Sequence, residues 1–153
     1  MAETIEGLAD LKAAFKDLAN DLKRKVLRAA LRDAAKPIQK AAVQAAPTLK
    51  SEHPYRLPGT LKKSIITKAS KRFRGQDGEI GVYVAVRKRK GLGGKSSARN
   101  PFDPFYWRFQ EFGTKNQPAR PFLRQAFDRN TTQAVDIFSR QVLKRIEKAN
   151  RRK

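Results

Sequence analysis

The stretch that decides the fold is FYWRFQEFGTKNQPARPFLRQAF, which runs from Phe105 to Phe127. It holds seven aromatic residues of a basic chain that has only nine Phe, three Tyr and one Trp in total. We therefore expect this stretch to be buried against another part of the protein. A short helix or helical turn is predicted from Phe105 to Phe112, and Gly113 ends it. A loop follows, and a second helix begins near Pro121, because proline suits the first helical position.

Residues 1–46 are predicted to form one long helix. Apolar residues recur there at alternating spacings of three and four, as in Leu8, Leu11, Phe15, Leu18 and Leu22. We expect a kink near Pro37, because proline removes one backbone hydrogen bond and clashes with the preceding turn. A free-standing coiled coil is the competing interpretation. The seam is leucine-rich for only about two heptads, which is fewer than a coiled coil needs.

Residues 60–86 are predicted to form a β-hairpin. The two β-prone runs are Ser64–Ala69 and Glu79–Val86, and the turn between them is Gly75–Gly78. Alternation in the second run places its valines on one face and Tyr83 on the other. With a last helix over residues 121–149, the sequence predicts an α+β fold. We expect a small antiparallel sheet of three to four strands, packed with the long N-terminal helix and the C-terminal helix.

The order of these features resembles the head–tail joining and tail-completion proteins of long-tailed bacteriophages, which are also called neck proteins. In that family a Tyr/Trp-rich turn ends in an EFGT-like tetrapeptide, and an ARPFLRPA-like run begins the last helix. The corresponding residues here are Glu111-Phe112-Gly113-Thr114 and Ala119–Ala126. Gln125 stands where a second proline is common in the family.

A second similarity to this family lies earlier in the chain. Family members show an Ala-Pro end to the first helix and a Gly-x-Leu-x-x-Ser-Ile approach to the first strand. This chain has Ala46-Pro47 and then Gly59-Thr60-Leu61-Lys62-Lys63-Ser64-Ile65. Together the two signatures extend from about Ala41 to Phe127.

The resemblance implies a structural virion protein without a cofactor. It would form a cyclic homo-oligomer of six or twelve subunits in the phage neck, where the ring joins the DNA-filled head to the tail. Its partners would be a head-closure or adaptor ring, tail-terminator or tail-tube proteins, and double-stranded genomic DNA in the channel. The protein would be made and assembled in the host cytoplasm and would remain in the virion.

Within the resembled signature, nine residues are candidates for the core or for a subunit interface: Trp107, Phe109, Glu111, Phe112, Gly113, Thr114, Arg120, Pro121 and Phe122. We expect the aromatic members to be mostly buried. Arg120 should be paired, with Glu111 as its partner, or should lie at a subunit boundary. Aromatic side chains found exposed would instead indicate an interface patch.

The formal net charge of +21 indicates an anionic partner. Residues 87–104 read RKRKGLGGKSSARNPFDP and begin with four consecutive cations. This segment is predicted to be a long mobile loop. Candidates to face DNA or the channel are Arg87, Lys88, Arg89, Lys90, Lys95 and Arg99. Phosphate contacts would be independent of base sequence. An architectural protein that binds nucleic acid without sequence preference is the alternative function.

The sequence does not support an enzyme. Gly93-Gly94-Lys95-Ser96 lacks the earlier glycine and the following helix of a phosphate-binding loop. His53 is the only histidine and has no ligand or catalytic pattern around it. There are no cysteines, so disulfides and thiolate metal sites are excluded. No signal peptide and no membrane-spanning run is visible in the sequence.

Overall fold

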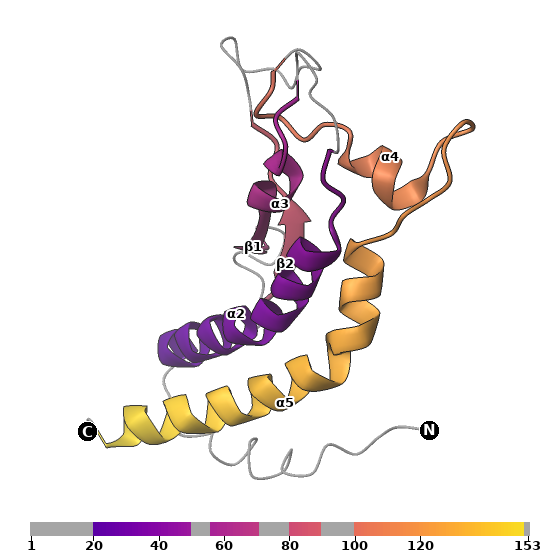
Figure 1. Ribbon diagram of the computed structural model, residues 1–153. Coiled ribbons are helices and arrows are strands. Elements are labelled where there is room, and N and C mark those ends of the chain that lie inside the picture. Colours follow the sequence, from indigo (N-terminus) through magenta and orange to yellow (C-terminus); the bar gives the residue numbers. More distant parts are fainter. Residues whose placement is uncertain (1–19, 50–55, 71–79, 90–99, 152–153) are drawn as a thin grey trace.

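The computed structural model describes residues 20–49, 56–70, 80–89 and 100–151. The elements follow in the order α2 (Asn20–Ala45), α3 (Thr60–Ser64), β1 (Ile65–Ala69), β2 (Val82–Val86), α4 (Trp107–Phe112) and α5 (Leu123–Asn150). Figure 1 shows α2 and α5 side by side, with α4 set apart beyond the beginning of α5. Helices combined with a small antiparallel sheet confirm the predicted fold class.

Helix α2 is the central element, because it packs against α5, against both strands and against α3. Alanines such as Ala30 and Ala42 are fully buried and let the neighbouring backbones approach closely. The helix continues through Pro37, and its ribbon bends along its length (Figure 1). A bend is the usual result of a proline inside a helix. The first nineteen residues of the predicted helix lie outside the described residues.

The predicted hairpin strands are confirmed as an antiparallel pair. Ile65 lies opposite Val86, and Ala69 lies opposite Val82. Tyr83 is exposed, whereas Val84 and Val86 pack in the core, as the two-residue period of a strand requires. The predicted turn at 75–78 lies outside the described residues.

A glutamine of α2 fixes this sheet to the helix. The side-chain amide nitrogen of Gln39 donates a hydrogen bond to the carbonyl oxygen of Ile65 at 3.0 Å. Its amide oxygen accepts a hydrogen bond from the Thr67 hydroxyl at 2.9 Å. One side chain therefore sets the position of β1 along α2.

The predicted count of three to four strands is wrong for the described part of the chain, which holds one two-stranded sheet. The residues just before β1, which fall in the predicted hairpin region, form the short helix α3. The Thr60 hydroxyl at the beginning of α3 donates to the carbonyl oxygen of Leu57 at 2.9 Å and also lies 3.3 Å from the carbonyl oxygen of Pro101. The contact with Pro101 comes from a distant segment, so local sequence carried no sign of it.

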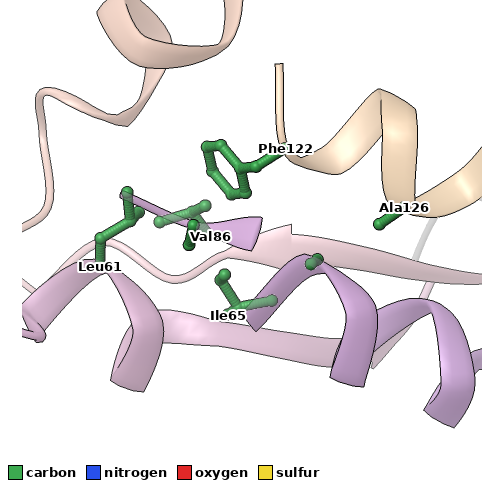
Figure 2. Close-up of a cluster of buried hydrophobic side chains, with 7 residues drawn as sticks. Leu61, Ile65, Val86, Phe122 and Ala126 are labelled. Carbon is green, nitrogen blue, oxygen red and sulfur yellow. The ribbon is translucent and has the colours of Figure 1, made fainter. Parts of the chain in front are cut away.

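Two apolar clusters hold the elements together. The first joins α2, α3, the sheet and the beginning of α5, and its buried members are Ala42, Ala46, Leu61, Ile65, Val86, Phe122 and Ala126. Figure 2 shows the Phe122 ring pointing toward the side chains of Leu61, Ile65 and Val86. The second cluster joins the other ends of the two long helices through Val26, Ala30, Val142 and Ile146. The aromatic signature is thus anchored to the core through Phe122.

Candidate subunit interface at the aromatic signature

Gly113 ends α4 as predicted, and the structure allows only glycine there. Its φ of 74° lies in the region that favours glycine, and its N–H donates to the carbonyl oxygen of Phe109 at 3.0 Å. A Cβ atom at this position would lie 2.8 Å from the backbone nitrogen of Ala119. Both the backbone conformation and the close approach of the returning chain therefore require a glycine.

After Gly113 the chain reverses in a tight turn. The N–H of Thr114 donates to the carbonyl oxygen of Gln117 at 2.8 Å, and the N–H of Gln117 donates back at 3.3 Å. The N–H of Arg120 then donates to the carbonyl oxygen of Gln110 at 2.7 Å. These bonds hold α4 rigidly against the segment that leads into α5.

Glu111 is buried and caps the beginning of α5. One carboxylate oxygen accepts hydrogen bonds from the backbone N–H groups of Phe122 at 2.8 Å and Leu123 at 3.0 Å. The other accepts a hydrogen bond from the backbone N–H of Arg124 at 3.0 Å. A helix leaves its first N–H groups without partners, and its dipole favours a negative charge at this end. Phe122 is at the N-cap position, and its side chain has no oxygen that could accept a hydrogen bond from these N–H groups. Glu111 supplies the cap from a distance.

The predicted pairing of Glu111 with Arg120 is therefore wrong. The Arg120 side chain is exposed and makes no ion pair with a carboxylate in the described segments. The Glu111 carboxylate is turned inward, toward backbone groups, and is not available at the surface. No local sequence pattern marked this role, because Glu111 lies eleven residues before Phe122 in the chain.

The expected burial of the signature aromatics is confirmed for Phe122 and wrong for two residues of α4. Phe122 is 1% exposed, while Phe109 and Phe112 are 48% and 65% exposed. Residues three or four apart share one face of a helix. In α4 the inward face carries Trp107 and Glu111, so Phe109 and Phe112 share the outward face. Trp107 is half-buried against the first cluster.

Arg56, which lies outside the aromatic signature, packs against two of its rings. The guanidinium carbon of Arg56 lies 5.4 Å from the ring centroids of both Phe105 and Tyr106, within cation–π range. Burial raises the pKa of the Tyr106 hydroxyl, and the Arg56 charge acts in the opposite direction. No sequence pattern links this arginine to the aromatic run, because the two are far apart in the chain.

Beside α4 these residues surround an open, mixed polar and apolar pocket of about 370 Å³. Its lining residues are Pro47, Thr48, Leu49, Arg56, Tyr106, Phe109, Gln110, Gln117 and Arg120. Phe109 and Arg120, both predicted from sequence, are therefore brought together at one surface. The pocket and the outward face of α4 form one continuous candidate interface.

Three of the predicted basic residues are described and exposed directly after β2: Arg87, Lys88 and Arg89. The N–H of Arg87 donates to the carbonyl oxygen of Ser64 at 2.8 Å, and the Asn100 side chain donates to the carbonyl oxygen of Arg89 at 3.1 Å. Their backbone is thus tied to the end of the sheet while their charges face solvent. Lys90, Lys95 and Arg99 lie outside the described residues.

Two further properties concern the part of the chain that the structure describes. It contains no group of three His, Cys, Asp or Glu residues arranged to hold a metal ion. None of its helices is both long enough and apolar enough to cross a lipid bilayer.

Residues 9–113 match the family model described as "Bacteriophage HK97-gp10, putative tail-component". The match covers more than two thirds of the chain and includes the hairpin, the basic segment and α4 through Gly113. The run Ala119–Ala126 and helix α5 lie beyond the matched residues. Comparison with curated proteins and with solved structures gives no match.

Proposed function

This chain belongs to the HK97-gp10-like family of bacteriophage tail components, and we propose that it forms a closed ring in the neck of a long-tailed phage. The ring joins the DNA-filled head to the tail and surrounds the DNA channel. Its axial neighbours are a head-closure or adaptor ring and tail-terminator or tail-tube proteins. The protein is thus a structural component of the virion, assembled in the host cytoplasm.

The observation that carries the ring is the exposed aromatic face of α4. Phe109 and Phe112 are about half or more exposed, although α4 itself is held firmly by Gly113 and by the Glu111 cap. Exposed apolar patches of this kind mark protein–protein contacts. Aromatic residues are enriched at the centre of such contacts. This face therefore supports a subunit interface.

The exposed cations after β2 support a surface that faces phosphate. Arg87, Lys88 and Arg89 follow one another at the end of the sheet, in a chain of net charge +21. Cations that neutralise phosphates bind duplex DNA whatever its sequence, which suits a channel through which a whole genome passes. The same cations favour the second candidate function, a nucleic-acid-binding architectural protein. The two functions differ in oligomeric state.

The mass of the purified protein in solution tests the ring. We expect a species of six or twelve subunits of 17.3 kDa each, measured by light scattering at low and at high salt. Added salt should favour assembly, because it screens repulsion between copies of a +21 chain. A monomer or dimer under all conditions that binds duplex DNA would instead support the architectural protein.

A pair of variants tests the proposed interface. Phe112→Lys places a charge on the outward face of α4, and we expect it to abolish the ring without changing the circular dichroism spectrum. Leu143→Lys is the matched control, because Leu143 is an exposed apolar residue of α5 away from α4, at 42% exposure. Rings that form equally well in both variants would exclude this face from the subunit contact.

A further inference from the structure

An open apolar groove of about 290 Å³ lies between α2 and α5, at the position of β2. Its lining is uncharged, and only one of its residues is polar: Leu31, Ala34, Ala35, Ile38, Val82, Phe127, Thr131, Ala134, Val135 and Phe138. The groove lies between the two buried clusters that join the long helices. Phe127 and Val135 on its α5 side remain 55% and 38% exposed. This surface therefore has the properties of an unfilled docking site.

The distribution of cations indicates which kind of partner binds in the α2–α5 groove. Nearly one residue in four of the chain is Lys or Arg, yet none of the residues that line the groove is; Arg32, Lys36 and Arg129 belong to the same segments but do not line it. A polyanion would find no cation in the groove lining to bind. Two copies of this chain repel each other through most of their surface, so they can approach closely only where cations are absent. The groove therefore fits a second copy better than a nucleic acid.

The outward face of α4 has matching properties. Residues 109–114 also lack Lys and Arg, and they present Phe109 and Phe112 to solvent; the nearby cations Arg56 and Arg120 line the pocket on the Phe109 side. Figure 1 places α4 beyond the beginning of α5, away from the α2–α5 pair, so the groove is not covered by the α4 of its own chain. One chain thus carries an apolar projection and an apolar groove at separate places.

We infer that the α4 helix of one subunit inserts Phe109 and Phe112 into the α2–α5 groove of the next subunit. This inference rests on the proposed ring and names the two surfaces that meet in it. A contact between two different patches is heterologous, and it closes into a ring when the rotation between subunits allows it.

Charges at the edges of the two surfaces are complementary. Asp128 follows Phe127 at the rim of the groove, is exposed, and has no ion pair with another described residue. Lys115 lies three residues after Phe112 and is also exposed. Opposite charges at the edge of an apolar contact fix its register more than they add to its affinity.

The chain contains no cysteine, so disulfide formation between introduced cysteines tests the contact against a clean background. Phe112→Cys and Val135→Cys are made in separate chains that carry different tags, and the two chains are co-expressed and oxidised. A disulfide needs Cα atoms within about 7 Å, so only direct neighbours can be linked. We expect a covalent dimer that contains one chain of each kind.

The matched control replaces Val135→Cys by Gln133→Cys, because Gln133 is exposed on α5 but does not line the groove. We expect at least a tenfold lower yield of mixed dimer with this partner. Neither Phe112→Cys nor Val135→Cys should form a disulfide when expressed alone. A chain that carries both substitutions should give a ladder of linked subunits up to the ring number.

Several results would overturn the inference. Self-linking of Phe112→Cys would show a two-fold contact between α4 helices, and equal yields with Gln133→Cys would show non-specific collision. If the pair at 112 and 135 fails to fold, Phe109→Cys with Phe127→Cys tests the same contact. A protein that forms rings but gives no mixed dimer with either pair keeps the proposed function and loses this interface. A protein that forms no ring contradicts the proposed function itself.

Discussion

At the scale of single residues, Glu111 links the two halves of the aromatic signature. Its carboxylate accepts three backbone N–H groups at the beginning of α5, although the residue itself belongs to α4. Each of these bonds is charge-assisted, and such bonds are roughly twice as strong as neutral ones. Together with the backbone bonds of the turn after Gly113, this side chain sets the orientation of α4 and hence the exposure of Phe109 and Phe112.

We expect Glu111→Ala to lower the free energy of unfolding by about 2–4 kcal/mol, because it leaves N–H groups without partners at a buried helix end. Glu111→Gln should have a smaller effect, because the amide oxygen still accepts. Urea denaturation at a fixed protein concentration measures both. Arg120→Ala is the control and should change the free energy by no more than about 0.5 kcal/mol. Equal losses in Glu111→Ala and Arg120→Ala would restore the pairing predicted from sequence.

At the scale of elements, a polar link supplements the apolar clusters between the two long helices. The Asp33 carboxylate of α2 accepts a hydrogen bond from the Arg145 guanidinium of α5 at 2.6 Å. Its other oxygen lies 2.7 Å from the Lys36 ammonium one turn along α2. These two cations, Lys36 more strongly than Arg145, hold the pKa of Asp33 below its usual value of 3.8, although burial acts in the opposite direction.

A lowered pKa in the folded state means that this link stabilises the fold above about pH 4. The contribution is lost as the pH falls through the lower, folded-state pKa, because the protonated carboxyl no longer pairs with the cations. We expect Asp33→Asn to be less stable than the wild type at pH 7 and to approach it as the pH falls below 3.8. Thermal unfolding across this range measures the difference.

Asp136→Asn serves as the control for this pH dependence. Asp136 is exposed on α5 and makes no ion pair with another described residue. Its replacement should leave the dependence of stability on pH unchanged. A parallel response of the two variants would show that the Asp33 link contributes nothing specific.

At the scale of the whole molecule, the net charge of +21 is the dominant property. We expect replacement of residues 87–90 by neutral residues to leave the fold and the ring intact and to weaken non-specific duplex binding. The plot of log affinity against log salt concentration should flatten by about 0.9 for each phosphate that the variant no longer neutralises. Fluorescence anisotropy with a labelled duplex at several salt concentrations measures this slope.

The matched control for the basic segment removes four other exposed cations, Arg140, Lys144, Lys148 and Arg151, which lie near the end of α5. If net charge alone governs DNA binding, the affinity for duplex DNA should fall by the same factor in both variants. A slope that changes only in the variant at 87–90 supports a channel-facing surface there. An unchanged affinity and slope in that variant would instead favour contact with an acidic partner protein.

Local sequence determined the parts of this protein that depend on backbone chemistry. Alternation of apolar residues predicted the pairing of β1 with β2, and Gly113 predicted the end of α4 because its positive φ excludes most other residues. The apolar stripe of α5 predicted that helix to within about two residues at its beginning, a normal margin for helix ends. The order of these motifs was also enough to indicate the family to which the chain belongs.

Only the tertiary structure decided which groups meet across long distances in the chain. The partner of Glu111 is a set of backbone N–H groups at the beginning of α5, where Phe122 packs in the core. Phe109 and Phe112 point outward because Trp107 and Glu111 occupy the inward face of a six-residue helix. Helix α3 lies at the beginning of the predicted hairpin region, where Thr60 contacts Pro101 from another segment. Sequence patterns report which side chains prefer burial, but a short helix has only one buried face, and packing selects it.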